Sequence, residues 1–178
     1  MAALETQTRQ RLDRGEVIIN TEPVDGSPLP RVTVLAVIEA APDRVWRVID
    51  AVRDYARTMG GVKSASELSR DATDDGERVR ARVTVKMPFP LKDLTSVTDA
   101  LHSVVPGERY RRAWELVEGD YDANSGSWTL TPFEGDAART LVTYDLHAAP
   151  HIRIPSSLYG LAQKKVIPRL IDHLRRQV

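Results

Sequence analysis

Hydrophobic and polar residues alternate along most of the chain between Glu77 and Ala149. In Glu77–Met87 this period of two predicts a strand with apolar residues on one face and charged residues on the other. The apolar face carries Val79, Ala81, Val83, Val85 and Met87, and the charged face carries Arg78, Arg80, Arg82 and Lys86. Turn signals recur about every 10 residues, so successive strands are expected to be antiparallel neighbours in a meander.

The beginning of the chain predicts two more strands and a helical region. Glu16–Asn20 reads as a short strand, and Val32–Glu39 follows it after the proline-rich stretch Thr21–Arg31. Pro42 is well placed as the first residue of a helix, because its missing N–H would have no partner there. Helical spacing then continues to Met59, with a break expected near Asp50–Arg53.

The period becomes helical again at the C-terminus, from Pro155 to Gln177. One stripe of this segment contains Tyr159, Ala162, Val166, Leu170 and Leu174. Pro168 falls inside the stripe, so a kink is expected near Lys164–Ile167. A long antiparallel sheet must cover its apolar face, and this helix is the obvious cover. The expected fold is therefore α+β, with a curved antiparallel sheet of about seven strands around a long C-terminal helix.

Composition agrees with one ordinary globular domain. The chain has 178 residues, 42% hydrophobic and 28% charged. Residues 1–14 are expected as an N-terminal arm, either a frayed helix or a disordered segment, and residues 15–178 as a single domain. Lys+Arg and Asp+Glu balance at 25 each, so no nucleic-acid partner is expected. There is no cysteine and no apolar run that approaches a transmembrane length, so the expected location is the cytoplasm.

Three segments resemble the helix-grip (SRPBCC) superfamily of START lipid-transfer domains, polyketide cyclases and aromatases, and coenzyme-Q-binding proteins. Val37–Met59 is similar to its strand and "A-P-x-x-V-W" helix start, and Gly126–Tyr144 to its paired "G-x-W-x-L-x-P" and "T-x-V-x-Y" strands. Ile154–Arg175 resembles its closing helix with an "I-P" entry. The resemblance covers Gly15–Gln177 and implies a cavity between the sheet and the long helix.

The function that the resemblance implies is binding or transport of a hydrophobic small molecule, such as a lipid, an isoprenoid or a polyketide-like compound. The expected ligand-binding residues lie on the elements that would surround the cavity. They are Met59, Val85, Met87, Phe89, Trp114, Trp128, Tyr144, Leu158, Tyr159 and Ala162. For each aromatic residue the alternative is packing in the core.

Two other functions stay open. A polyketide cyclase or dehydratase-like enzyme would need a base in the cavity and a group that stabilises an enolate. The candidates on strands are Asp99, His102, Arg112, Glu115 and Asp145. No pattern pairs them, and the chain has no G-x-S-x-G elbow or nucleotide-binding glycine loop, so no catalytic residue and no cofactor is assigned. A toxin-like branch of the superfamily associates with ribosomes, and the row Arg78, Arg80 and Arg82 could serve such a contact.

Histidine spacing does not indicate a metal site. His147 and His151 are four residues apart, but Pro150 lies between them at the end of a strand. A last expectation concerns ligand entry. The loop Met87–Leu91 is predicted to oppose the first half of the C-terminal helix, with ligand passing between them. The alternative is that Phe89 fills the core and that Pro168 only bends the helix.

Overall fold

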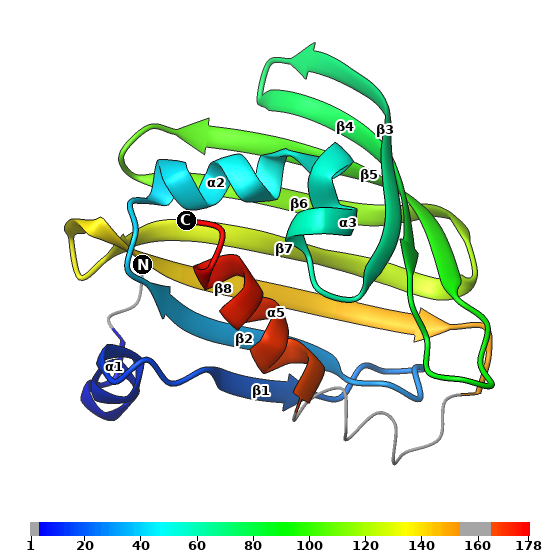
Figure 1. The fold of residues 1–178 in the computed structure, drawn as a ribbon, viewed down its shortest axis with the longest axis horizontal. Helices are drawn as coiled ribbons and strands as arrows, with labels where there is room; N and C mark the ends of the chain where they lie inside the picture. The colour runs from blue at the N-terminus through cyan, green and yellow to red at the C-terminus, as the bar shows by residue number, and fades with distance from the viewer. Residues whose placement is uncertain (1–3, 154–164) are drawn as a thin grey trace.

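An eight-stranded antiparallel sheet with helices on both faces forms the fold (Figure 1). The computed structural model describes residues 4–153 and 165–178. The strands are β1 (Ile18–Glu22), β2 (Arg31–Ile38), β3 (Val62–Thr73), β4 (Gly76–Val85), β5 (Leu94–Val105), β6 (Arg109–Gly119), β7 (Tyr121–Phe133) and β8 (Asp136–Pro150). The helices are α1 (Thr6–Asp13), α2 (Pro42–Asp50), the single turn η1 (Val52–Asp54), α3 (Tyr55–Thr58) and α5 (Ile167–Arg175).

The strand order is β1-β2-β8-β7-β6-β5-β4-β3, so β1 and β3 are the edges of the sheet. From β3 to β8 each strand pairs with the next, which is the meander that the turn signals predict. The β1–β2 hairpin instead joins the sheet by pairing β2 with the last strand, β8. The prediction of about seven strands is low by one. The prolines of the β1–β2 loop leave β1 paired along its whole length, Ile18–Glu22.

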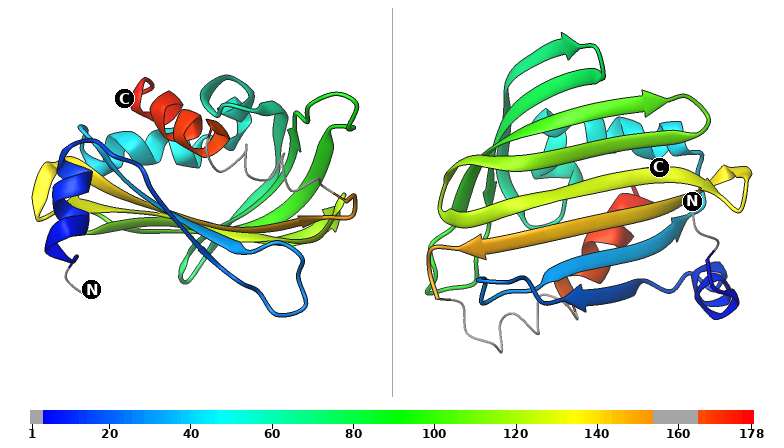
Figure 2. Two further views of the ribbon diagram at one scale, coloured as in Figure 1. Left: turned by 90° about the horizontal axis from the view of Figure 1, so that it is seen from below. Right: turned by 180° about the vertical axis from the view of Figure 1, so that it is seen from behind.

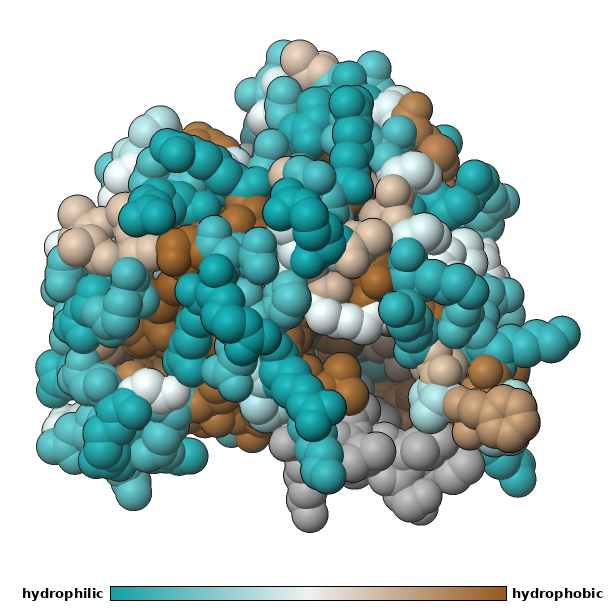
Figure 3. Space-filling view, viewed as in Figure 1, coloured by the Kyte–Doolittle hydropathy of each residue, from teal (hydrophilic) through white to brown (hydrophobic). Residues whose placement is uncertain are grey.

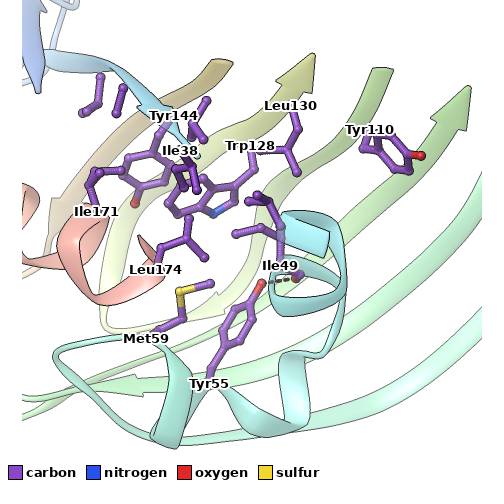
Figure 4. Packing of buried hydrophobic residues seen from close by; sticks show 14 of the residues in the cluster. Ile38, Ile49, Tyr55, Met59, Tyr110, Trp128, Leu130, Tyr144, Ile171 and Leu174 are labelled. Carbon is purple, nitrogen blue, oxygen red and sulfur yellow. Dashed lines mark hydrogen bonds between the residues drawn. The ribbon is translucent and has the colours of Figure 1, made fainter. Parts of the chain in front are cut away.

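Helices α2, η1, α3 and α5 all lie on one side of the curved sheet, which we call the concave face (Figure 2). Helix α2 begins at Pro42 and ends at Asp50, as the sequence predicts. The apolar side chains of these helices and of the concave face form the main core. Figure 4 shows Ile171 and Leu174 of α5 packed beside Tyr144 and Trp128 of the sheet.

The C-terminal helix is irregular where the sequence predicts a kink. The α-helix α5 spans Ile167–Arg175 with Pro168 in its first turn, and Lys165 and Val166 directly before it are in π-helix. The earlier part of the predicted helix, residues 155–164, lies outside the described residues. The far end of α5 is fixed by Arg175, whose guanidinium donates to the carbonyl oxygens of Val37 and Gly15. None of the described helices has the length and apolar composition needed to cross a membrane.

Helix α1 covers part of the opposite face of the sheet (Figure 2). Its Leu12 is 1% exposed and packs in a second, smaller apolar cluster with Val37, Phe133 and Leu141. Of the two alternatives for the N-terminal arm, the structure has the helix, and Leu12 is its buried anchor. The two faces of the sheet have separate cores, and the larger one contains the candidate site.

Candidate functional site

Strand register places a continuous row of polar and aromatic side chains across the concave face. His102 of β5 is the cross-strand partner of Arg112 of β6, and Arg112 is in turn the partner of Trp128 of β7. Trp128 is then the partner of Tyr144 of β8. Cross-strand partners point to the same face and stand about 5 Å apart, so these four side chains are neighbours. None is more than 9% exposed.

Three aromatic rings stack at one end of this row. The ring centroids of Trp128 and Tyr144 are 4.1 Å apart with an interplanar angle of 25°, and those of Trp114 and Tyr144 are 6.2 Å apart. Trp114 lies over Gly126, its partner on β7, where a Cβ atom would stand 2.6 Å from the indole ring. The indole N–H of Trp114 donates to Oδ1 of Asn124 at 3.0 Å, which fixes the ring from its edge.

The guanidinium group of Arg112 is a buried cation beside these rings. Its Cζ atom lies 5.2 Å from the ring centroid of Trp114 and 5.7 Å from that of Tyr55, which is within range of a cation–π interaction. Its Nε donates to Nε2 of His102 at 3.1 Å, and this is the only hydrogen bond that the guanidinium makes to a described residue. No fully buried side-chain nitrogen or oxygen among the described residues lacks a hydrogen-bond partner, so a terminal nitrogen of Arg112 that no described residue pairs is not fully buried.

His102 is oriented by a carboxylate on its other side. Its Nδ1 lies 2.7 Å from Oδ1 of Asp50, which also accepts from Nη1 of Arg70 at 3.0 Å. Burial, helped by the charge of Arg112, lowers the pKa of His102, so the imidazole is neutral near pH 7. Because Nε2 accepts from Arg112, the ring proton is on Nδ1 and is donated to Asp50. That hydrogen bond lowers the pKa of Asp50.

The chemistry of this arrangement is recognition more than proton transfer. Both ring nitrogens of His102 are engaged, so the imidazole holds Arg112 in place. Burial raises the pKa of Tyr144, which keeps its hydroxyl protonated. The concave face thus presents a cation beside an aromatic wall, which suits a mostly apolar molecule with one oxygen-bearing group.

The structure brings together some of the residues that the sequence predicts to contact ligand. Trp114, Trp128 and Tyr144 form the ring stack, and Met59 packs in the same cluster near Leu174 (Figure 4). Leu158, Tyr159 and Ala162 lie outside the described residues. In Figure 3, hydrophobic side chains are visible at the bottom of a depression beside α5.

The other predicted residues lie at the end of β4. Val85 and Met87 are partly buried there, and the backbone N–H of Met87 donates to the Asp93 carboxylate at 3.1 Å. Phe89 is 97% exposed, so its side chain belongs to the surface and forms no wall of the concave site. The alternative that Phe89 fills the core is wrong as well. The loop that carries it extends beyond the last β4–β5 pair, Val85 with Leu94, and has no strand to hold the ring inward.

Three of the charged candidates for an enzymatic role point to the opposite face. Asp99 accepts two hydrogen bonds from Arg80, each 2.7 Å long, and Asp145 is paired with Arg31. Glu115 is the exposed cross-strand partner of Asp99. These side chains line a hollow of about 520 Å³ together with Arg31, Arg78, Arg111 and several apolar residues. The arginine row is thus partly neutralised by neighbouring carboxylates, as a solvated outer face would be.

The sequence does not predict the residues that position Arg112 indirectly, through hydrogen bonds to its neighbours. Asp50 is expected only as a helix break, yet it is the hydrogen-bond partner of His102, which is 52 residues away. Arg70 and Asn124 also stand outside the expected site. A hydrophobic pattern carries no information on which polar side chains meet across elements, so the only signal was the inward-facing position of His102 and Arg112 in their strands.

The family model described as "Polyketide cyclase / dehydrase and lipid transport" matches residues 38–175. The chain belongs to this family. The match begins in β2 and ends with α5, and so includes every element of the concave site. The description of the polyketide cyclase / dehydrase and lipid transport family joins an enzymatic class with a carrier class, and membership alone does not choose between them. No curated protein sequence matches the chain.

Solved structures give the same fold. The STAR-related lipid transfer protein of Xanthomonas axonopodis is 23% identical, with a TM-score of 0.73 over 90% of this chain and 92% of that one. Human StAR-related lipid transfer protein 5 is 13% identical, with a TM-score of 0.74 over 92% and 82%. The Zhui aromatase/cyclase of Streptomyces sp. R1128 is 18% identical, with a TM-score of 0.58 over 83% and 92%.

Proposed function

We propose that this protein binds a hydrophobic small molecule on the concave face, between the sheet and the C-terminal segment, and acts as its carrier or sensor. The observation that supports this best is the buried Arg112, 4% exposed, with its terminal N–H groups unpaired by described residues. The proposed wall of the site contains Met59, Val85, Met87, Trp114, Trp128 and Tyr144, together with Leu158, Tyr159 and Ala162 as the sequence predicts.

The physical argument is one of matching polarity. A charged N–H donor at the edge of an apolar surface gains most from an acceptor that water does not already supply, so a carboxylate, carbonyl or hydroxyl oxygen of a ligand would pair well with Arg112. The surrounding rings of Trp114, Trp128 and Tyr144 favour an apolar body next to that oxygen. The proposed ligand class is therefore a lipid, isoprenoid or polyketide-like molecule with a polar end. The cytoplasm remains the expected place of action.

The first test is native mass spectrometry of the protein purified gently from its host, followed by extraction of any bound molecule. A panel of fatty acids, isoprenoids and aromatic polyketides is then titrated, with quenching of tryptophan fluorescence as the signal. Arg112→Met is expected to weaken binding of ligands with an oxygen-bearing end by about ten- to hundredfold, because a hydrogen bond to a charged group is lost. A hydrocarbon ligand of similar size is expected to lose little.

Arg111→Met is the matched control, because Arg111 is exposed on the same strand and points to the opposite face. Near-ultraviolet circular dichroism checks that the rings of the Arg112 variant remain packed. If the wild-type protein carries no ligand and binds nothing in the panel, the proposal fails. Equal affinities of the two variants would remove Arg112 from the site.

A cyclase or dehydratase-like enzyme is the second candidate, favoured by one observation. A neutral buried histidine and a buried arginine lie side by side on the face that would hold the substrate. The mass of the extracted ligand separates the two functions. A carrier returns a polyketide-like molecule unchanged, whereas an enzyme returns a product that has lost water.

A further inference from the structure

One large hydrophobic side chain stands out on the surface of this protein. Phe89, in the loop between β4 and β5, is 97% exposed, whereas the next most exposed large hydrophobic side chain among the described residues, Val166, is 49% exposed. Removing such a ring from water is favourable, so a partner that covers it would gain binding energy.

The loop is tied in a way that keeps Phe89 outward. The backbone N–H of Leu91 donates to the carbonyl oxygen of Pro88 at 3.0 Å, which closes a turn with Phe89 at its tip. Asp93 holds the base of the loop, because its carboxylate accepts from the N–H of Met87 at 3.1 Å and from Nζ of Lys63 at 2.6 Å. Phe89 is therefore presented on a closed turn.

The charge around this ring is positive. Lys86 and Lys92 flank the turn and are both exposed. The only acidic residue of the segment 86–93 is Asp93, and its charge is compensated by Lys63. Two lysines thus remain to interact with an anionic partner, on both sides of an apolar tip.

The same end of the sheet carries a second exposed apolar residue. Backbone hydrogen bonds join Asp120 to Thr95 at the start of β5 and to His151 just after β8. Ile152, 37% exposed, follows His151 and precedes the exposed Arg153. Figures 1 and 2 both show the β4–β5 loop beside the end of β8. Phe89, Ile152 and the basic side chains of Lys86, Lys92 and Arg153 therefore lie at one end of the concave face. Two carboxylates, Asp120 and Asp122, lie at this end as well, and Asp122 pairs with His151 at 2.6 Å.

We propose that the β4–β5 loop docks the protein on an anionic lipid membrane, with Phe89 inserted between the lipids and Lys86 and Lys92 against their phosphates. An aromatic ring flanked by lysines matches the layered polarity of a bilayer surface, which is apolar below and negatively charged above. Docking at this end would bring the concave face to the bilayer. This step goes beyond the proposed function, since it concerns where the ligand is collected.

The test is co-sedimentation of the wild-type protein with vesicles of phosphatidylcholine alone and of equal parts phosphatidylcholine and phosphatidylglycerol. Binding is expected to the mixed vesicles and to weaken with salt. Phe89→Ser should reduce the partition coefficient about ten- to hundredfold, the value for burial of one large apolar side chain. Lys86→Gln with Lys92→Gln should reduce it about fivefold for each lysine. Phe89→Trp should keep binding, and brominated acyl chains should quench its added fluorescence.

Matched controls lie at the opposite end of the sheet, in the β5–β6 turn. Val105→Ser removes an exposed apolar side chain there, and Arg109→Gln removes an exposed charge. Neither should change vesicle binding. Equal binding of Phe89→Ser and the wild type would overturn the proposal, as would the absence of binding to either vesicle. Self-association in solution that Phe89→Ser abolishes would also overturn it, because the ring would then be covered by a second copy.

The outcome is independent of the proposed function. A protein that carries a ligand but ignores vesicles would refute the docking alone. A protein whose vesicle binding depends on Phe89 but which binds nothing in the ligand panel would refute the carrier function alone.

Discussion

Replacing Gly126 with alanine should disturb the aromatic stack directly. A Cβ atom at Gly126 would stand 2.6 Å and 2.8 Å from two carbons of the Trp114 ring, and closer still to the carbonyl oxygen of Asp145. Carbon atoms in contact prefer separations near 3.5 Å, so the ring would have to move by about 1 Å or the strands would have to part.

The cost follows from these contacts. Overpacking of a well-filled core by one methyl group costs about 1–3 kcal/mol, and the rigid backbone on one side favours the upper end. A small gain of about 0.4–1 kcal/mol from the stiffer unfolded chain offsets part of it. We therefore expect the free energy of unfolding to fall by about 1–3 kcal/mol, measured by urea denaturation followed by far-ultraviolet circular dichroism. The near-ultraviolet signal of the tryptophans should change as well.

Gly60→Ala is the control, because no atom lies within 4 Å of a Cβ at that position. It should change stability by no more than about 0.5 kcal/mol. A double-mutant cycle with Trp114→Leu then isolates the ring contact, since the cost of Gly126→Ala should shrink when the ring is absent. A Gly126→Ala protein with wild-type stability and an unchanged tryptophan spectrum would refute this account of the site.

Two further outcomes can be measured by urea denaturation. Because burial lowers the pKa of His102 in the folded state, the unfolded chain binds a proton more readily below about pH 6.5, so stability should fall as the pH drops from 7.5 to 5.5. The lowered pKa of Asp50 adds a second loss below about pH 4. His102→Gln should remove the first loss and reduce the second, because the hydrogen bond from His102 is the main cause of the lowered pKa of Asp50. A profile identical to that of the wild type would contradict this assignment. Leu12→Ala should lower the free energy of unfolding by about 2–4 kcal/mol, because Leu12 is 1% exposed in the second core. Leu68→Ala is the control: this position is 44% exposed, and its loss should be less than about 1 kcal/mol. Equally small losses for the two variants would show that α1 is not docked.

Much of the fold could be predicted because its signals are local. The alternation in β4 and the glycine turn before it require only neighbouring residues, and both the strand and its hairpin with β3 are found. The start of α2 at Pro42 follows from one residue and its position. The first strand is also found, but two residues later than predicted, at Ile18–Glu22, since the proline-rich loop that follows it does not interrupt its pairing.

The site could be predicted only in part, for the same reason. Inward alternation brings Trp128 and Tyr144 together, and their ring stack follows from strand register. The contact of His102 with Asp50 depends on how α2 lies over β5, which no local pattern encodes. Phe89 was misplaced because hydrophobicity alone suggests an inward position, whereas a tied turn beyond the paired strands directs the ring outward.

The anchoring of α5 by Arg175 has a consequence for the order in which the protein can be completed. Its guanidinium bonds to carbonyl groups 138 and 160 residues earlier in the chain. Contacts of such long sequence separation carry a large loop-closure entropy and are expected to form late in folding. During synthesis, the anchor does not exist until all eight strands and the helices before α5 have been made. The apolar concave face of the sheet must therefore be formed first and covered by α5 last.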